Sequence, residues 1–171
     1  MGTLSLDYIA GLIAGEGTFV LAVQRIAARK GKARVVPMFA IFMTDEETIM
    51  QVADALREHG LPVYYQERLK AGSKGNPRKH VGIHIGGIKR VKRYCDTFAP
   101  LLTGQKRQAA LLVQEFCDSR LATPRDGTTG RPAYTQRQFA IIEELRSVNG
   151  IGNGRKNPVG ILRGHTSDTG N

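Results

Sequence analysis

The sequence predicts an α+β fold of the order αββαββα, in which an antiparallel four-stranded sheet carries the helices on one face. Three observations lead to this prediction. Four runs of residues alternate between apolar and polar side chains, which is typical of half-buried strands. The runs come in two pairs, and each pair is followed by an amphipathic stretch with helix-capping residues. A chain of 171 residues is long enough for such a domain to bury its own core.

The first part of the chain contains one expected helix and one expected hairpin. The helix covers residues 6–15, because Ser5 is a favourable N-cap and Asp7 in the first turn complements the helix dipole. Alternating residues then predict strands over 18–24 and 35–43. The loop that joins these strands is rich in Lys and Arg.

A second helix and a second hairpin follow. The stretch 44–60 opens with a capping box from Thr44 to Glu47 and closes at a glycine, so we expect it to be helical. Strands are expected over 63–70 and 78–85, separated by a turn rich in glycine. The apolar side of the last strand consists of Val81, Ile83 and Ile85.

The remaining elements are helical. Helices are expected over 88–102, 103–121 and 134–150, and the first of them is expected to end near Pro100. Thr103 is the predicted N-cap of the second of these, and the third opens with a capping box from Thr135 to Gln138. Residues 1–150 are therefore expected to form a single domain. Residues 151–171 are rich in Gly, Asn and basic residues, which predicts a flexible tail.

Charge narrows the class of function. The chain has 25 Lys and Arg against 15 Asp and Glu, a net charge of +10. Such an excess is typical of proteins that bind a polyanion, most often nucleic acid, although a merely soluble basic protein remains an alternative. Aromatic residues make up only 6% of the chain, which argues against a protein that stacks single-stranded bases.

The expected compartment is a reducing one. Cys95 and Cys117 fit neither a disulfide framework nor a zinc pattern, and both fall in apolar helical stretches, as inert core thiols do. Neither a secretory signal peptide nor an apolar run of about 20 residues occurs in the sequence. We therefore expect a protein of the cytoplasm or nucleoid, or of an organellar matrix in a eukaryote, and not a secreted one.

The stretch IAGLIAGEG, residues 9–17, has an unusual pattern for a helix. Gly11 and Gly15 lie four residues apart on one helix face, with Ala10 and Ala14 beside them. Small residues at this spacing let two helix backbones approach closely, and an ordinary helix packed on its own domain gives the same pattern. The partner helix belongs either to this domain or to a second copy of the chain.

Glu16 ends this helix and opposes the helix dipole, at a cost of about 0.3–1 kcal/mol. A surface salt bridge offsets such a cost, and so does a bound divalent cation, since Mg²⁺ prefers carboxylate oxygens. If the partner helix is that of a second copy, a two-fold axis brings two Glu16 side chains together. Paired acids with bound metal in a basic protein indicate metal-assisted phosphodiester hydrolysis.

The same nine residues resemble the LAGLIDADG motif of homing endonucleases, and Glu16 stands where the motif carries its catalytic acid. Ala14 replaces the consensus acid at a position that varies in the family. The resemblance continues through the order of elements to about residue 148, and LLTGQKRQAALLV at 101–113 is similar to the family's basic segment before a late helix. The letters identical to the motif are Ala10, Gly11, Leu12, Ile13 and Gly17.

The resemblance implies a single-motif, intron-encoded homing endonuclease that acts as a homodimer. Such an enzyme cleaves both strands of a long, pseudo-palindromic double-stranded DNA target by metal-assisted hydrolysis. Glu16 and the backbone carbonyl of Gly15 are then expected to bind metal. Two or more Mg²⁺ ions per dimer are implied, with Mn²⁺ able to replace them and Ca²⁺ able to bind without supporting cleavage. The implied dimer interface is Ala10, Gly11, Ala14 and Gly15.

Further catalytic roles are implied by position. Asp45 follows the second strand, where the family usually has a polar residue that positions the attacking water, although an acid in the first turn of a helix is also simply stabilising. A basic residue near the start of a late helix typically polarises solvent near the metals. The alignment places Gln105 there, and we favour Lys106 beside it, with plain surface charge as the alternative.

The sheet face opposite the helices is the expected DNA-binding surface. Alternation along the strands directs to this face Val20, Ala22, Gln24, Tyr64, Gln66, Arg68, Lys70, Arg78, His80 and His84. Of these, Gln66, Arg68 and Lys70 carry donors suited to purine edges. Phosphate contacts, which position the protein without reading sequence, are expected from Arg25, Arg29, Lys30, Lys32, Arg34, Lys74 and Lys79 on the hairpin loops.

Two alternative functions stay open at this point. Proteins of the same fold also serve as RNA maturases, which assist intron splicing, or as non-cleaving DNA-binding proteins. The acid at Glu16 favours cleavage, because a protein that only binds has no need of it. An unrelated basic protein associated with RNA or the ribosome would require the motif match to be accidental.

Overall fold

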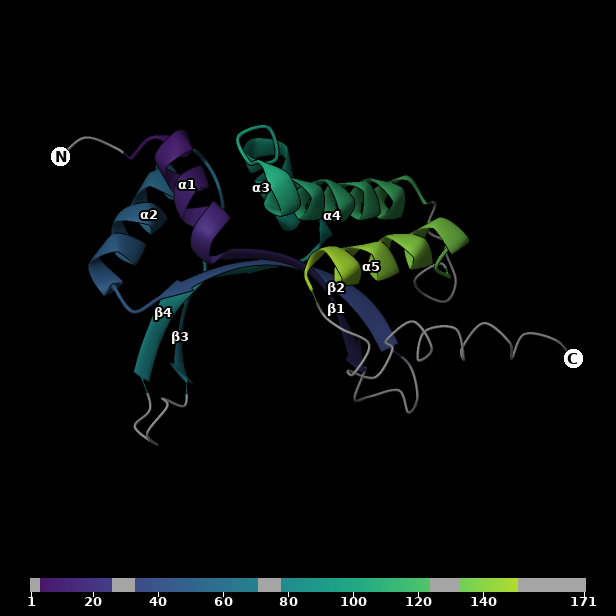
Figure 1. The fold of residues 1–171 in the computed structure, drawn as a ribbon, viewed down its shortest axis with the longest axis horizontal. Coiled ribbons are helices and arrows are strands. Elements are labelled where there is room, and N and C mark those ends of the chain that lie inside the picture. The colour runs from purple at the N-terminus through teal and green to yellow at the C-terminus, as the bar shows by residue number, and fades with distance from the viewer. Residues whose placement is uncertain (1–3, 26–32, 71–77, 124–132, 151–171) are drawn as a thin grey trace, which may run out of the picture.

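The computed structural model describes residues 4–25, 33–70, 78–123 and 133–150, and its elements follow one another in the expected order (Figure 1). The helices are α1 (Leu6–Glu16), α2 (Glu46–Glu58), α3 (Ile88–Phe98), α4 (Gly104–Ala122) and α5 (Gln136–Val148). The strands are β1 (Gly17–Arg25), β2 (Ala33–Met43), β3 (Tyr65–Lys70) and β4 (Arg78–Gly86).

The strands form one antiparallel sheet with the order β1-β2-β4-β3. The two hairpins therefore meet in the middle through β2 and β4, while β1 and β3 form the edges. Figure 1 shows the described helices on one face of this sheet, and the hairpins curve away from them, so that the other face is concave. The predicted α+β class, with helices on one face of a four-stranded sheet, is confirmed.

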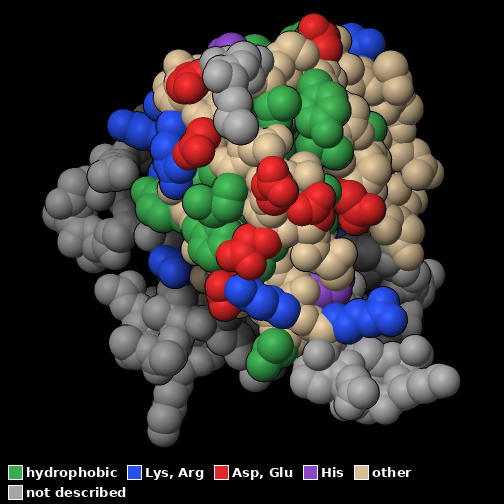
Figure 2. All heavy atoms as spheres, turned by 90° about the vertical axis from the view of Figure 1, so that its left-hand side faces the viewer, with side chains coloured by type: hydrophobic (Ala, Val, Ile, Leu, Met, Phe, Trp, Pro, Cys, Tyr) green, Lys and Arg blue, Asp and Glu red, His purple; other side chains and the backbone are tan. Residues whose placement is uncertain are grey.

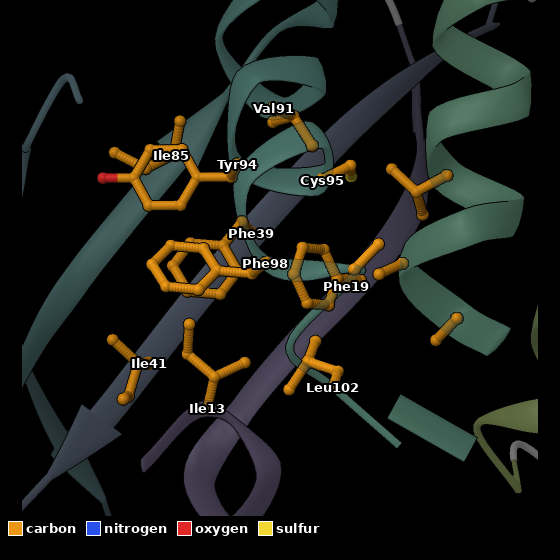
Figure 3. Close-up of a cluster of buried hydrophobic side chains, with 14 of the residues drawn as sticks. Ile13, Phe19, Phe39, Ile41, Ile85, Val91, Tyr94, Cys95, Phe98 and Leu102 are labelled. Atoms are coloured by element: carbon orange, nitrogen blue, oxygen red, sulfur yellow. The ribbon is translucent and has the colours of Figure 1, made fainter. Parts of the chain in front are cut away.

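Side-chain alternation decides which residues enter the core. Phe19, Phe39 and Ile85 are cross-strand neighbours on β1, β2 and β4, and none is more than 1% exposed. Tyr94 of α3 stacks on Phe39 with ring centroids 4.8 Å apart, and Figure 3 shows Ile13 of α1 in the same cluster. Burial of such side chains supplies the main favourable free energy of folding. The predicted core side of β4 is confirmed, since the buried residues of that strand include Val81, Ile83 and Ile85.

Helix α1 passes into β1 without a loop, and Gly17 makes this possible. Its N–H donates to the carbonyl of Ile13, and its extended backbone (φ −77°, ψ 155°) begins the strand. A Cβ atom at this position would lie 2.7 Å from both Cγ2 and O of Ile13. Close packing therefore requires glycine here, although the backbone angles do not, and the junction leaves Glu16 as the last residue of the helix.

The start of α2 differs from the prediction. Its N-cap is Asp45 and not Thr44, so the predicted capping box from Thr44 to Glu47 is wrong. The Asp45 carboxylate accepts a hydrogen bond from the backbone N–H of Thr48 at 3.2 Å. A short acidic side chain is as good an N-cap as a hydroxyl, and here the extended backbone of the cap falls one residue later than the sequence suggests.

Other predicted helix starts are confirmed or corrected individually. Ser5 caps α1, and the capping box of Thr135 and Gln138 opens α5. Thr103 occupies the N-cap position of α4, but its side chain makes no capping hydrogen bond. Helix α3 ends at Phe98 with Ala99 as its C-cap, next to Pro100, near which the sequence predicts the end.

Three smaller expectations concern the thiols, the membrane and the tail. Cys95 and Cys117 are buried and free, and burial raises the pKa of both thiols, that of Cys117 to about 12, so both are core thiols as predicted. No helix among the described residues is long and apolar enough to cross a membrane. The tail expected over 151–171 lies outside the described residues.

Candidate active site and nucleic-acid interface

The carboxylate of Glu16 is exposed at the C-terminal end of α1. Within the part of the chain that the structure describes, it makes no hydrogen bond and no ion pair. The helix dipole disfavours a negative charge at this end, and no basic residue lies in the last turn of α1. The Glu16 carboxylate is therefore open to a cation from solution.

The start of α4 lies beside the end of the motif helix. Lys106 is half-buried, and its Nζ donates a hydrogen bond to the carbonyl oxygen of Gly17, the residue after Glu16. The fold thus brings Lys106, from a distant part of the sequence, into contact with the residue that follows Glu16. Gln105 is exposed at the start of the same helix. Of these two neighbours, Lys106 is the one that contacts the motif.

Sequence reasoning missed a second contact at the same edge of the sheet. Asn149, at the end of α5, donates from Nδ2 to the carbonyl oxygen of Phe19 at 3.0 Å. Gly17 and Phe19 lie two residues apart on β1, so their carbonyls point to the same side of the strand. That side is the free edge of the sheet. Helices α4 and α5 therefore cap the edge strand next to Glu16. The one signal for Asn149 in the sequence is its place before the helix-ending Gly150.

Asp45 is held by its capping role. Its Oδ2 accepts from the hydroxyl of Thr48 at 2.7 Å, and its Oδ1 accepts from the Thr48 backbone N–H. These hydrogen bonds, the side-chain one first, lower the pKa of Asp45 below its usual value. The carboxylate is exposed, ionised and fixed in orientation. Its predicted contact with an attacking water stays a prediction.

The small residues of α1 divide between the core and the surface. Gly11, Ala14 and Gly15 are exposed, and a Cβ atom at either glycine would meet nothing within 4 Å. Nothing among the described residues covers their face of the helix, so the motif helix does not pack closely through it on any helix that the structure describes. Ala10 is only 4% exposed and lies in the core with Ile9, so the expectation that it joins the open face is wrong. We call Gly11, Ala14 and Gly15 the open stripe.

The concave face of the sheet carries the side chains predicted for base contacts. Strand register places cross-strand pairs on this face at Gln24–Arg34 and His80–Arg68, and Arg78 shares the face by alternation along β4. Gln66 and His84 share the face by the same alternation. Tyr64 lies just before β3, and its hydroxyl accepts from Nη1 of Arg90 at 2.6 Å.

His84 is distinctive among these residues. Its Nε2 is buried and has no hydrogen-bond partner among the described residues. Burial, and then the charge of Arg68, lowers the pKa of His84 below its usual value. The imidazole is therefore neutral near pH 7.

Lys79 is not a loop residue, and its predicted phosphate contact is not supported. It lies within β4 on the face that carries the helices, with Nζ 3.0 Å from Oε1 of Glu67 and 3.2 Å from Oε2 of Glu46. These carboxylates raise the pKa of Lys79 and neutralise its charge locally. Alternation along β4 turns it away from the concave face.

The other predicted phosphate contacts have mixed outcomes. Arg34 also lies within a strand, β2, but on the concave face, where its Nη2 donates to Oε1 of Gln24 at 3.3 Å. Arg25 is the last residue of β1. Arg29, Lys30, Lys32 and Lys74 lie outside the described residues.

Charge is distributed unevenly between the two sides of the molecule. Figure 2 shows the side formed by α1 and α2, on which acidic side chains gather around exposed apolar ones. The exposed acids of these two helices include Asp7, Glu16, Glu46, Glu47, Asp54 and Glu58. A polyanion is repelled from this side, so its binding surface is expected on the concave face, where the basic side chains of β2, β3 and β4 lie.

The arrangement matches known structures. A search of family models gave no match, and a sequence comparison with curated proteins gave none either. I-Vdi141I, an archaeal intron-encoded homing endonuclease in complex with DNA, is 21% identical, with 92% of each chain covered and a TM-score of 0.63. The homing endonuclease I-CvuI, in complex with its target in the presence of Ca, is 13% identical, with 92% of this chain and 90% of that chain covered and a TM-score of 0.59.

A longer protein matches over part of its length. I-LtrWI, a LAGLIDADG homing endonuclease bound to target DNA, is 18% identical, with 86% of this chain and 44% of that chain covered and a TM-score of 0.56. These TM-scores establish a shared fold, and the motif of α1 agrees with it independently. The chain therefore has the fold of the LAGLIDADG homing endonucleases.

Proposed function

We propose that this protein is a sequence-specific endonuclease that binds double-stranded DNA as a homodimer and cleaves both strands with the help of a divalent metal. The observation that carries the proposal is the position of Glu16. It stands exposed and unpaired among the described residues at the end of the motif helix, one residue before the carbonyl that Lys106 contacts. An acid placed against the helix dipole is costly unless it serves a ligand.

The concave face supports the choice of DNA as substrate. Its rows of Arg, Gln and His side chains offer donors for the base edges of a major groove. I-Vdi141I and I-LtrWI, which share the fold, were solved with DNA. The acidic side of α1 and α2 leaves the concave face as the surface where a phosphate backbone is attracted.

The open stripe supports a homodimer. Two copies of α1 with exposed Gly11, Ala14 and Gly15 are able to pack closely about a two-fold axis. The comparisons agree, because this chain spans about nine-tenths of I-CvuI but less than half of I-LtrWI. A chain of twice the length has room for two such domains, which this protein would supply as two copies. In such a dimer, Glu16 and the partner's Glu16 approach the axis together.

The residues at the end of α1 suit a hard divalent cation. The Glu16 carboxylate and the Gly15 carbonyl are oxygen donors, which Mg²⁺ and Ca²⁺ prefer. No cluster of three or more His, Cys, Asp or Glu side chains that would hold a metal occurs in the described ranges of one chain. The proposal therefore takes the remaining ligands from the partner's Glu16, from DNA phosphates and from water.

Each residue has a defined task in the proposed hydrolysis. A divalent ion at this site would lower the pKa of a bound water molecule and stabilise the negative charge that develops on the phosphate. Glu16 and the Gly15 carbonyl bind it, and Asp45 orients the attacking water. Lys106, anchored on the Gly17 carbonyl, places a positive charge beside Glu16. Gln105, at the exposed start of α4, is available to the surrounding water.

The experiment is a selection followed by cleavage. The full-length protein selects duplexes from a randomised library in Ca²⁺, and the recovered duplexes are then incubated with protein in Mg²⁺, Mn²⁺ or EDTA. We expect a pseudo-palindromic consensus, binding that weakens steeply with added salt, and double-strand cleavage only with metal. Selection without cleavage in any metal would indicate a non-cleaving binder, and failure to select any duplex would contradict the whole proposal.

A further inference from the structure

Gly82 lies in the middle of β4, where glycine is an unfavourable strand residue. Two neighbours on β2, the carbonyl oxygen of Ile41 and the aromatic ring of Phe42, leave no room for a side chain here. A Cβ atom at Gly82 would lie 2.5 Å from Cδ1 of Phe42 and 2.1 Å from the carbonyl oxygen of Ile41. The ring therefore occupies the space that a side chain at Gly82 would fill.

This arrangement lets a residue of β2 contact a residue of β3, although β4 runs between these strands. Phe42, Gly82 and Gln66 are direct cross-strand neighbours on β2, β4 and β3. Across the bare glycine, the Phe42 ring reaches Arg68, whose Cζ lies 4.1 Å from the ring centroid. A guanidinium at this distance is held by cation–π attraction and stacking.

Arg68 is fixed from a second direction as well. Its Nη2 donates to Oε1 of Gln66 at 3.1 Å. A glutamine normally reads adenine with one acceptor and one donor. Here Arg68 uses one of the two lone pairs of Gln66 Oε1, so donors outnumber acceptors among the groups that remain on the two side chains. Guanine is the base that presents two acceptors, N7 and O6, in the major groove.

We propose that Phe42, which packs over Gly82, is a positioning residue that presents Arg68 and Gln66 as a donor-rich pair to a guanine in each half-site of the DNA. The inference rests on the proposed DNA-binding function and adds to it a base identity and the residue that enforces it. Phe42 itself makes no base contact in this scheme. It acts by restricting the rotamers of Arg68. An unrestrained arginine side chain loses the freedom of several rotatable bonds when it binds, and this entropy loss weakens binding.

The test measures base preference with three single variants at apolar positions, and with Arg68→Ala alone and combined with Phe42→Leu. Phe42→Leu removes the ring and keeps an apolar cover over the sheet. Phe42→Tyr retains the ring, and Val36→Ala changes another apolar side chain on the concave side of β2, far along the strand. Each variant competes for the selected duplex and for duplexes changed at single positions, in Ca²⁺, and each is checked for unchanged thermal unfolding.

The inference expects one symmetric pair of positions to prefer G·C and to depend on Arg68. Phe42→Leu should lower that preference by about two- to fivefold, the strength of an exposed cation–π contact, and leave other positions unchanged. Phe42→Tyr and Val36→Ala should keep it. In an Arg68→Ala background, Phe42→Leu should have no further effect on that position, because Phe42 acts through Arg68.

Two results would overturn the inference while leaving the proposed function intact. They are an unchanged preference in Phe42→Leu, and a loss spread evenly over all positions. A pair of positions that depends on Arg68 but prefers a base other than guanine would refute the assigned base identity. If the wild-type protein selects no duplex, the proposed function fails and this inference fails with it.

Discussion

Substitution of Gly17 tests quantitatively why α1 passes directly into β1 and ends at Glu16. In Gly17→Ala, the new Cβ atom would meet Cγ2 and O of Ile13 at 2.7 Å and its Cα at 2.9 Å. The O and Cα atoms belong to the helix backbone, so no side-chain rotation relieves the clash. Overpacking of this kind costs about 1–3 kcal/mol, and we expect the upper part of that range because backbone atoms are involved.

Such a loss is measurable without unfolding the protein. A domain of this size loses roughly 2–4 °C in Tm for each kcal/mol, so Gly17→Ala should melt roughly 4–12 °C lower than the wild type. The carbonyl of Gly17 also anchors Lys106, so the substitution should slow cleavage beyond its effect on stability. The assay is urea and thermal unfolding followed by circular dichroism at matched protein concentrations, since association raises apparent stability.

Gly86→Ala is the matched control. No atom lies within 4 Å of a Cβ at Gly86, and this glycine is not among those with a positive φ. Its substitution should change stability by less than about 0.5 kcal/mol. Equal stability of Gly17→Ala and the wild type would refute the steric account of the junction, and an equal loss in both variants would show that the effect is not specific to it.

Three further predictions address the metal, the dimer and pH. Glu16→Gln keeps the shape of the side chain and removes its charge, so cleavage should fall by orders of magnitude while gel-shift affinity in Ca²⁺ is retained; normal plasmid cutting would exclude Glu16 from the catalytic role. Gly15→Leu should fold as a protomer, because the position is open, but should disrupt the dimer in light scattering, whereas an unchanged dimer would place the interface elsewhere. Burial and Arg68 hold the pKa of His84 below 6.5, so on acidification the unfolded chain takes up the proton first and folding stability falls as the pH drops below about 6.5. His84→Gln should weaken that fall between pH 7.5 and 5.5 in urea titrations, and the same slope in both proteins would contradict the assignment.

The order of elements and their faces could be predicted from sequence because both depend on local patterns. Alternation fixed which side of each strand is buried, as Phe19, Phe39 and Ile85 show. The same alternation predicted the concave-face residues Gln66 and Arg68. Where the prediction depended on one residue of register, as with Thr44 and Asp45 at the start of α2, it failed, since neighbouring residues are almost equally good caps.

Only the tertiary structure decided which distant residues meet. Nothing local in the sequence relates Lys106 to Gly17, Asn149 to Phe19, or Phe42 to Arg68, because each contact is set by how strands and helices pack across the sheet. The packing also separated Ala10 from its neighbours Gly11 and Gly15, and turned Lys79 toward Glu46 and Glu67. The sequence thus determined the motif, its acid and the fold that carries them. The environment of each charge depended on contacts made in three dimensions, which residue spacing along the chain does not encode.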